Sequence, residues 1–577
     1  MTATTATVAE NTNSCSAEPV TTDLTEAISG ARARAESVCA EGRLSFARGF
    51  VFAVVNSYWR GWQSYASDPW SVCEFPSDVE TGRVPEADKE LAETIGQTAT
   101  SLDPVDAGYK IGVLYTGMLP RQYRTALGAY YTPPALCERL LDMATRAGVD
   151  WRSARVLDPA CGGCAFLSPV ARRMAASLKD DDAKSALTSI SRRLNGFELD
   201  PFAAWLSTVF LEATLDDLCR KARARLKCVV RVCDSLDESV EDDGFDLVVG
   251  NPPYGRLKLS PDLREKYRRS LFGHANLYGV FTDLALRFAK AGGVIAYVTP
   301  TSFLAGEYFK ALRGLLGREA PPSSIDFIEE RKGVFADVLQ ETLLAVYRRG
   351  GDPGAARVSF VSPGAKGSIK TTAAGSFCLP KNPDEPWLMP RTKAQSRLLR
   401  DIDGSPYRLA DYGYTVSTGP LVWNRHKPSL RAGPGKGRYP LIWAESIRSD
   451  GVFEFRAEKR NHKPFFKPKT KERWVLTECP CVLLQRTTAK EQCRRLIAAE
   501  LPASFIDEHG AVAVENHLNM IKPANGAPKV SPAAVAVLLN SNALDQVFRC
   551  INDSVAVSAY ELAALPLPWL CESANTV

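Results

Sequence analysis

The sequence lacks several features that would assign it to common classes of protein. Of its 15 cysteines, only Cys161 and Cys164 form a C-x-x-C pair, and no second pair completes a four-ligand zinc site. We therefore expect reduced thiols and no bound metal. The chain also lacks a run of about 18 apolar residues, and its first five residues carry no basic group of the kind that opens a signal peptide. These absences predict a cytoplasmic protein with no membrane partner.

The N-terminal part lacks the pair of acidic strands followed by a lysine that would indicate a nuclease, so a fused nuclease is only a minor alternative. Residues 1–22 are rich in Thr, Ala, Ser and Asn and predict a disordered tail. Residues 23–128 predict a helical region, because apolar side chains between Leu44 and Trp59 recur near helical spacing.

Charge is small in total but unevenly distributed. The chain of 577 residues is long enough for two or three domains, and its net charge is only +5. Residues 351–577 hold 30 Lys and Arg against 21 Asp and Glu, and residues 421–473 alone hold 14 basic and 5 acidic residues. A basic region confined to one part of a nearly neutral chain indicates a polyanionic partner such as nucleic acid.

The central feature is an apolar run that ends abruptly in polar and rigid residues, with the sequence FDLVVGNPPY at 245–254. The apolar part predicts a buried strand of a parallel sheet. Two prolines then hold the backbone and remove N–H groups, which leaves the carbonyls of Asn251 and Pro252 available as acceptors. With the Asn251 amide oxygen and the flat ring of Tyr254, this segment suits an amine-bearing heterocycle.

Strands and helices alternate from residue 153 onward. Alternating units of this kind predict a Rossmann-like, doubly wound α/β sheet with right-handed crossovers, whose ligands lie outside the carboxyl ends of the strands. The expected strands are 155–157, 194–199, 228–232, 245–249, 294–298, 324–329 and 342–347. The expected helices are 165–178, 201–220, 276–290 and 306–317. The polar segment 179–193 is expected to be a surface insertion.

Four successive strands end in a side chain that can bind a polar ligand, namely Asp158, Glu198, Asp234 and Asn251. The first is followed by a turn of small residues that lets the backbone approach a ligand and directs N–H groups toward it. An acid at the end of the second strand is typical of a group that binds ribose hydroxyls. Because these ends share one edge of the predicted sheet, the combination is far more specific than any single residue.

Several motifs in this order resemble the gamma-type adenine-N6 DNA methyltransferases of bacterial type II restriction-modification systems. They are YYTPP at 130–134, DPACG at 158–162, FELD at 197–200, Asp234, NPPY at 251–254 and NLYGVF at 276–281. The resemblance is dense over residues 108–348. It is looser in the C-terminal part, where it rests on QRT at 485–487, ENH at 515–517 and LPLP at 565–568.

The resemblance implies S-adenosyl-L-methionine as the methyl donor and gives roles to the matching residues. The donor-binding residues would be Thr132, Asp158, Ala160, Gly162, Glu198, Asp234 and Phe281. The transfer site would comprise Asn251, Pro252, Pro253 and Tyr254, with Phe335 as the second aromatic face of a pocket for a flipped-out adenine. One residue departs from the family pattern, since Cys164 stands where glycine is usual and brings a Cβ and a sulfur into the donor loop.

The remaining chain is expected to hold a separate domain. We divide it into an S-adenosylmethionine-dependent methyltransferase domain over 129–350, a linker or loop-rich crossover over 351–390, and a mixed DNA target-recognition domain over 391–577. Lys and Arg in the basic region would contact DNA phosphates without reading sequence. The candidate DNA-binding residues are Arg425, Lys427, Lys436, Arg438, Lys463, Lys467 and Lys469.

The leading hypothesis is methylation of adenine N6 in double-stranded DNA by a monomer, which protects the DNA from a cognate restriction endonuclease. Two alternatives remain open. The same NPPY geometry serves a nucleobase in RNA or a glutamine amide in a protein, although the long basic region disfavours a small protein methylase. A catalytically dead DNA-specificity subunit is the other alternative, and the intact motif at 251–254 disfavours it.

Overall fold

The computed structural model describes residues 19–127, 131–239, 243–329, 341–402, 407–489, 492–524 and 528–568. Within these ranges, no helix combines the length and the apolar character needed to cross a bilayer. The chain divides into two compact units, of which the first comprises 1–145 and 149–255 and the second comprises 146–148 and 256–577. The predicted divisions at 128/129 and 350/351 do not coincide with the division between these units.

The first unit begins with helices, as the spacing of apolar residues predicts. They are α1 (Pro19–Glu36), α2 (Arg43–Gln63), α3 (Glu86–Ala99), α4 (Pro104–Met118) and α5 (Arg121–Leu127). Helix α4 starts where the Asp103 side chain accepts a hydrogen bond from Val105 N at 3.0 Å. Helices α2 and α3 approach closely at Gly96, which has no side chain. A Cβ on Gly96 would lie only 2.4 Å from the carbonyl oxygen of Val54.

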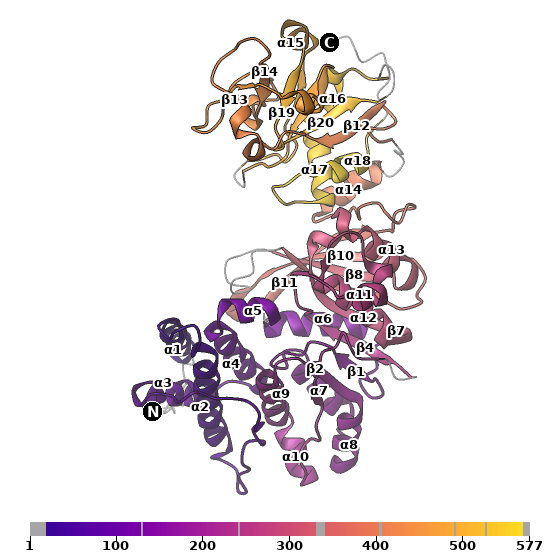
Figure 1. Ribbon diagram of the computed structural model, residues 1–577. Helices are drawn as coiled ribbons and strands as arrows, with labels where there is room; N and C mark the ends of the chain where they lie inside the picture. The colour runs from indigo at the N-terminus through magenta and orange to yellow at the C-terminus, as the bar shows by residue number, and fades with distance from the viewer. Residues whose placement is uncertain are drawn as a thin grey trace, which may run out of the picture. The chain divides into compact units, whose positions relative to one another are not determined.

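The first unit then forms a parallel α/β layer (Figure 1). Its strands are β1 (Val156–Asp158), β2 (Leu194–Glu198), β3 (Val230–Val232) and β4 (Phe245–Gly250), which lie in the order β4-β1-β2-β3 and are all parallel. The accompanying helices are α6 (Pro134–Arg146), α7 (Leu167–Ser177), α8 (Ala183–Arg193), α9 (Pro201–Thr214) and α10 (Asp216–Ala222). All four strands therefore end at one edge, as the βα alternation predicts.

The segment 179–193 is more regular than expected. It contains helix α8, which buries Leu187 and Ile190 and begins where the Asp182 side chain accepts from Ser185 N at 3.0 Å. The predicted surface insertion is therefore an amphipathic helix leading into β2. Most residues of this helix are polar or charged, so its few apolar positions do not form a clear helical pattern in the sequence.

In the second unit the strand directions are mixed, which corrects the prediction that the doubly wound sheet is parallel. The strands β7 (Ala289–Pro300), β8 (Pro322–Ile328), β9 (Thr342–Arg348), β10 (Ala356–Pro363) and β11 (Ile369–Phe377) lie in the order β11-β10-β8-β9-β7. β9 is antiparallel to both β7 and β8, and β10 is parallel to β8. A small ladder of β5 (Arg256–Leu257) and β6 (Ala275–Asn276) and the helices α11 (Pro261–Lys266), α12 (Leu277–Phe288) and α13 (Lys310–Glu319) belong to the same unit.

The stretch 351–390, expected to be a linker or loop-rich crossover, contains the antiparallel pair β10 and β11. Val358 and Val361 of β10 are buried, while much of β11 faces solvent. Because β11 is an exposed edge strand with few apolar residues, its sequence shows no clear alternation.

The rest of the second unit holds two further sheets, in agreement with the expected mixed C-terminal region. One is antiparallel and consists of β12 (Tyr414–Thr418), β20 (Leu518–Pro523), β17 (Cys481–Gln485) and β18 (Ala498–Leu501). The other consists of β13 (Leu430–Arg431), β15 (Phe465–Phe466), β14 (Tyr439–Ile442), β19 (Val512–Val514) and β16 (Leu476–Thr477). The helices are α14 (Lys393–Ile402), α15 (Ala503–His509), α16 (Pro532–Leu539), α17 (Asn542–Ile551) and α18 (Ala559–Ala564).

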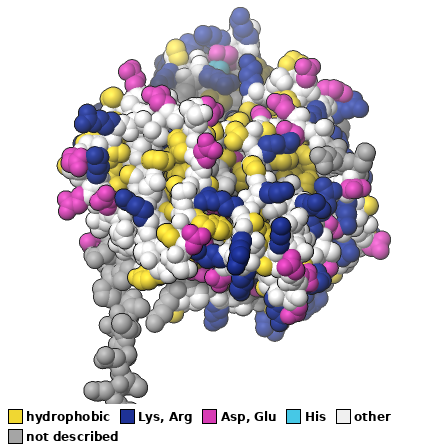
Figure 2. Space-filling view, turned by 90° about the horizontal axis from the view of Figure 1, so that it is seen from below, with side chains coloured by type: hydrophobic (Ala, Val, Ile, Leu, Met, Phe, Trp, Pro, Cys, Tyr) yellow, Lys and Arg dark blue, Asp and Glu magenta, His cyan; other side chains and the backbone are white. Residues whose placement is uncertain are grey.

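Short 3-10 helices complete the described elements. They are Arg268–Ser270, Thr301–Phe303, Glu307–Phe309, Ala365–Gly367, Trp423–Arg425, Lys427–Ser429, Ala444–Ser446 and Thr470–Val475. On the face shown in Figure 2, Lys and Arg side chains are mixed with Asp and Glu side chains, and hydrophobic side chains are visible between them.

Candidate active site at the carboxyl ends of the parallel strands

Strand β1 ends at Asp158, and the loop that follows turns sharply around small residues. Asp158 is only 1% exposed, and its Oδ1 accepts a hydrogen bond from Ala160 N at 3.0 Å. Burial raises the pKa of the Asp158 carboxyl to about 8, and the nearby Glu198 charge adds to this increase. Gly162 has φ +53°, a conformation that favours glycine.

The loop also contains a residue that is strained for its type. Cys164 has φ +62°, in the left-handed region, although it carries a Cβ. Its Sγ lies 2.6 Å from Ser168 Oγ, and its thiol is buried. The departure from the family pattern at this position therefore falls where the backbone itself favours glycine.

Strand β2 ends at Glu198, which is joined to the loop after β1. Its Oε2 accepts from Gly162 N at 2.8 Å and its Oε1 accepts from Asp200 N at 2.9 Å. Burial raises the pKa of the Glu198 carboxyl to about 7, against the opposing effect of these two N–H groups. The structure thus brings the first two predicted strand ends together.

Strand β3 brings Asp234 to the same edge. Cys233 N donates to Glu198 O at 3.0 Å, and Ser235 Oγ donates to Pro159 O at 2.5 Å, so the residues on both sides of Asp234 contact the other two strand ends. The Asp234 side chain is exposed, and its Oδ1 accepts from Leu236 N at 2.9 Å. The remaining acceptor capacity of this carboxylate faces solvent.

Strand β4 ends against Asp158. A Cβ on Gly250 would lie 2.7 Å from Asp158 Oδ1, so only glycine fits here. Asn251 follows, and its Nδ2 donates to Thr132 Oγ1 at 3.1 Å, while Thr132 itself is buried. Pro252 is buried, and Pro253 and Tyr254 are half-buried. Thr132, Asp158, Glu198, Asp234 and Asn251 therefore all belong to one edge of the first unit.

Sequence reasoning gave no role to three residues at this edge. Leu199 and Val232, directly at the ends of β2 and β3, are apolar yet 55% and 52% exposed. Exposed apolar side chains of this kind can contact the face of a planar ring. Tyr131 is the third, because a Cβ on Gly163 would lie 2.3 Å from its ring. An exposed apolar residue at a strand end cannot be recognised before exposure is known.

Two predicted residues do not belong to the described part of the first unit. Phe281 lies on α12 in the second unit, where its side chain is buried. Phe335 falls outside the described residues. Both assignments stay predictions.

The candidate DNA-binding residues lie in the second unit, around the sheet that contains β13, β14 and β15. Arg425, Lys427, Lys436, Lys463, Lys467 and Lys469 are exposed. Arg438 is half-buried, and its Nη1 donates to the Gly433 carbonyl at 2.9 Å, so part of its donor capacity stabilises its own loop.

The aromatic residues of this region are divided between core and surface. Trp443 and Phe466 are buried in a small core, and Trp443 stacks on His462 with ring centroids 3.7 Å apart. Trp474, which the sequence did not single out, is 69% exposed. This region therefore combines exposed basic side chains with a buried aromatic core. The side chain of Trp474 faces solvent.

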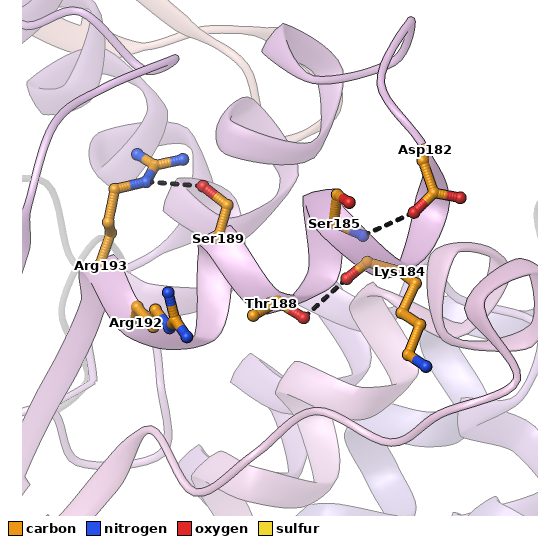
Figure 3. Close-up of a pocket in the computed structure, with 7 residues that line it drawn as sticks. All are labelled: Asp182, Lys184, Ser185, Thr188, Ser189, Arg192 and Arg193. Atoms are coloured by element: carbon orange, nitrogen blue, oxygen red, sulfur yellow. Dashed lines mark hydrogen bonds between the residues drawn. The ribbon is translucent and has the colours of Figure 1, made fainter.

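A surface hollow lies along α8 (Figure 3). Its lining comprises Asp182, Lys184, Ser185, Thr188, Ser189, Arg192 and Arg193. Arg193 directly precedes β2, so this hollow lies at the amino end of that strand. Ligands of such sheets bind at the opposite, carboxyl end, and the hollow is therefore separate from the candidate site.

Comparison with known proteins finds similar type II methyltransferases. A family model described as "Eco57I restriction-modification methylase" matches residues 198–335. The type II methyltransferase M.BsuBI of Bacillus subtilis is 25% identical over 77% of this chain and 88% of its own length. The type II methyltransferase M.PstI of Providencia stuartii is 28% identical over 56% of this chain and 65% of its own length.

A solved structure of the Type IIL restriction-modification enzyme MmeI in complex with DNA is also similar. It has a TM-score of 0.54 at 13% identity and covers 95% of this chain and 88% of that chain. Similarity at this identity concerns the fold alone, and it extends over both compact units.

Proposed function

We propose that the chain is a type II DNA methyltransferase of the Eco57I restriction-modification family and that it methylates N6 of an adenine flipped out of duplex DNA. The observation that carries the proposal is the shared edge of β1, β2, β3 and β4. There, Gly250 packs against Asp158, the next residue Asn251 donates to Thr132, and Glu198 contacts the loop after β1. One edge thus offers a place for a nucleoside-bearing donor and acceptors for an amine.

The residues of this edge fit S-adenosyl-L-methionine. Each Glu198 oxygen accepts one backbone N–H, and a carboxylate oxygen has capacity for a further donor, such as a ribose hydroxyl. Asp234 can accept from an adenine amine, and the exposed side chains of Leu199 and Val232 offer apolar contact to the ring. The turn through Gly162 leaves room for close approach of the backbone. When bound, this donor supplies an electrophilic methyl group on a sulfonium.

Asn251 and Pro252 provide the acceptors for the target amine. Because Asn251 Nδ2 points to Thr132, its Oδ1 is directed away from Thr132, on the other branch of the planar amide. In the proposed complex, that oxygen and the Pro252 carbonyl accept the two N6 hydrogens and favour a nitrogen with an available lone pair. Stabilisation then comes from fixed dipoles and alignment, with no covalent enzyme intermediate.

Tyr254 supplies one face for the extruded base in this proposal. Extrusion costs a few kcal/mol, which stacking on an aromatic ring offsets. Burial raises the pKa of the Tyr254 hydroxyl, so the ring stays neutral when it stacks. Phe335 is proposed as the opposite face, and Phe281 as a packing partner of the donor's adenine, both from the family resemblance.

The exposed Lys and Arg around β13, β14 and β15 are proposed to contact the phosphates of double-stranded DNA. The biological partner would be a cognate restriction endonuclease, from which methylation protects the same site. We propose that the enzyme acts as a monomer.

A test in cells distinguishes the proposal from its alternatives. Total DNA from cells that express the wild-type protein is sequenced for methylated bases, with Asn251→Ala as the matched control. The proposal expects N6-methyladenine at one recurrent sequence in the wild type and none in the control. DNA without N6-methyladenine in both strains would reject it.

A further inference from the structure

The carboxylate of Asp200, at the start of α9, is held by residues from distant helices. It is 1% exposed, and its Oδ1 accepts from Phe202 N at 3.1 Å as the N-cap of α9. Arg48 of α2 donates Nη2 to the same Oδ1 at 3.0 Å, and Tyr115 of α4 donates its hydroxyl to Oδ2 at 2.6 Å. A cap alone needs only one carboxylate oxygen. Here Tyr115 of α4 also binds the second oxygen, Oδ2, and Arg48 of α2 pairs with the negative charge.

This carboxylate is directly connected to the predicted ribose-binding residue. The backbone N of Asp200 donates to Glu198 Oε1 at 2.9 Å, and Glu198 Oε2 accepts from Gly162 N at 2.8 Å. A shift of Asp200 would therefore change the direction of the Glu198 carboxylate and its contact with the loop after β1. The chain of contacts runs from α2 and α4 to the proposed donor site without a gap.

Helix α4 reaches the loop after β1 by a second route. A Cβ on Gly112 of α4 would lie 2.3 Å from the Tyr131 ring, and a Cβ on Gly163 of the loop would also lie 2.3 Å from that ring. The ring of Tyr131 thus fits tightly between the helix and the loop. Because both contacts need glycine, this packing leaves little freedom for the loop.

We propose that the N-terminal helical region positions the methyl-donor site, with Arg48 and Tyr115 as positioning residues that act through Asp200. This inference rests on the proposed function, because the ligand is the donor of that reaction. It assigns a role to helices that carry no catalytic motif. A purely structural role predicts a loss of stability alone, whereas positioning predicts a loss of donor affinity.

The variants Tyr115→Phe and Arg48→Gln separate the two roles. Tyr115→Phe removes one hydroxyl with little change in packing volume, and Arg48→Gln removes the charge. The matched control is Arg60→Gln, on the same helix α2, where the side chain is 69% exposed and its nitrogen lies 3.8 Å from Glu93. Titration calorimetry with S-adenosyl-L-methionine measures Kd, methyl-transfer assays give KM for the donor and kcat, and thermal unfolding gives Tm.

We expect each variant to raise the donor Kd and KM by about tenfold, a typical coupling between linked sites, with kcat at saturating donor near the wild-type value. Arg60→Gln should leave all three unchanged, and Arg48→Lys should recover part of the affinity because the charge remains. If both variants lower Tm but keep Kd within twofold of the control, the proposal is overturned. A wild type that neither binds the donor nor transfers methyl would reject the proposed function and this inference with it.

Discussion

Asn251 donates its Nδ2 to Thr132 Oγ1 over 3.1 Å, although the two residues are 119 positions apart in the sequence. This hydrogen bond joins the segment before α6 to the end of β4. It fixes which end of the Asn251 amide is directed toward Thr132, and so gives the amide oxygen a defined direction. The residue expected to bind the donor thus also orients the residue expected to bind the target amine.

Replacing Thr132 by Val keeps the side-chain shape but removes the acceptor for Asn251. We expect kcat to fall by about tenfold to a hundredfold, because small errors in the placement of a reacting group carry costs of this size. Single-turnover methyl transfer measures the effect. Thr188→Val, in the surface hollow along α8, is the control, and equal rates for the two variants would show that the hydrogen bond does not orient Asn251.

The carboxyls of Asp158 and Glu198 at this edge predict a dependence of stability on pH in the protein without donor. Burial raises the pKa of Asp158 to about 8 and that of Glu198 to about 7. In the unfolded chain both ionise near pH 4, so between about pH 4 and pH 8 the folded state binds more protons. The contribution of these carboxyls to stability is present below about pH 4 and is lost as pH rises to 8.

Asp158→Asn should therefore lose stability less steeply with rising pH than the wild type does, by up to about 1.4 kcal/mol per pH unit for one proton. Urea unfolding at pH 5, 6, 7 and 8 measures the difference. Asp180→Asn, at an exposed position, serves as the control. Parallel curves for wild type and Asp158→Asn would contradict the raised pKa.

The left-handed backbone of Cys164 gives a prediction about two small residues. Both Cys164→Gly and Cys164→Ala remove the thiol and its contact with Ser168 Oγ. Only glycine relieves the strain, so Cys164→Gly should be more stable than Cys164→Ala by about 1 kcal/mol. Chemical unfolding of both variants provides the comparison, and an alanine variant of equal or higher stability would refute the strain.

The basic residues of the second unit predict a change in salt dependence. Replacing Lys463, Lys467 and Lys469 together by Ala should weaken binding to duplex DNA and reduce the slope of log K against log salt by about 1 for each phosphate that is no longer neutralised. The control removes the same charge from the first unit, at Lys179, Lys184 and Lys221, which are also exposed. Equal slopes for the two triple variants would exclude this surface from the DNA interface.

The strand ends of the first unit could be predicted because each apolar strand stops at a polar residue in the chain itself. Asp158, Glu198, Asp234 and Asn251 all lie at the expected edge for this reason. The hydrogen bond of Asn251 with Thr132 and that of Arg48 with Asp200 join distant segments, and no local spacing encodes them. They require the packed fold.

Strand direction was the weaker part of the prediction. Buried strands such as β7 and β9 are apolar on both faces whether their neighbours are parallel or antiparallel, so periodicity could not show that they run in opposite directions. The sequence also could not show which apolar side chains are exposed to solvent. Leu199 and Val232 resemble core residues in the sequence, yet they face solvent at the edge proposed to bind the donor.

The most direct test of the central claim is the fate of a labelled methyl group. Purified wild-type protein and Asn251→Ala are each incubated with methyl-labelled S-adenosyl-L-methionine and duplex DNA, and the nucleosides are then separated. The account predicts label on N6 of adenine with the wild type and at least about a hundredfold less with Asn251→Ala, while both bind the donor with similar affinity. Label on cytosine, no label on the DNA, or full transfer by Asn251→Ala would contradict it.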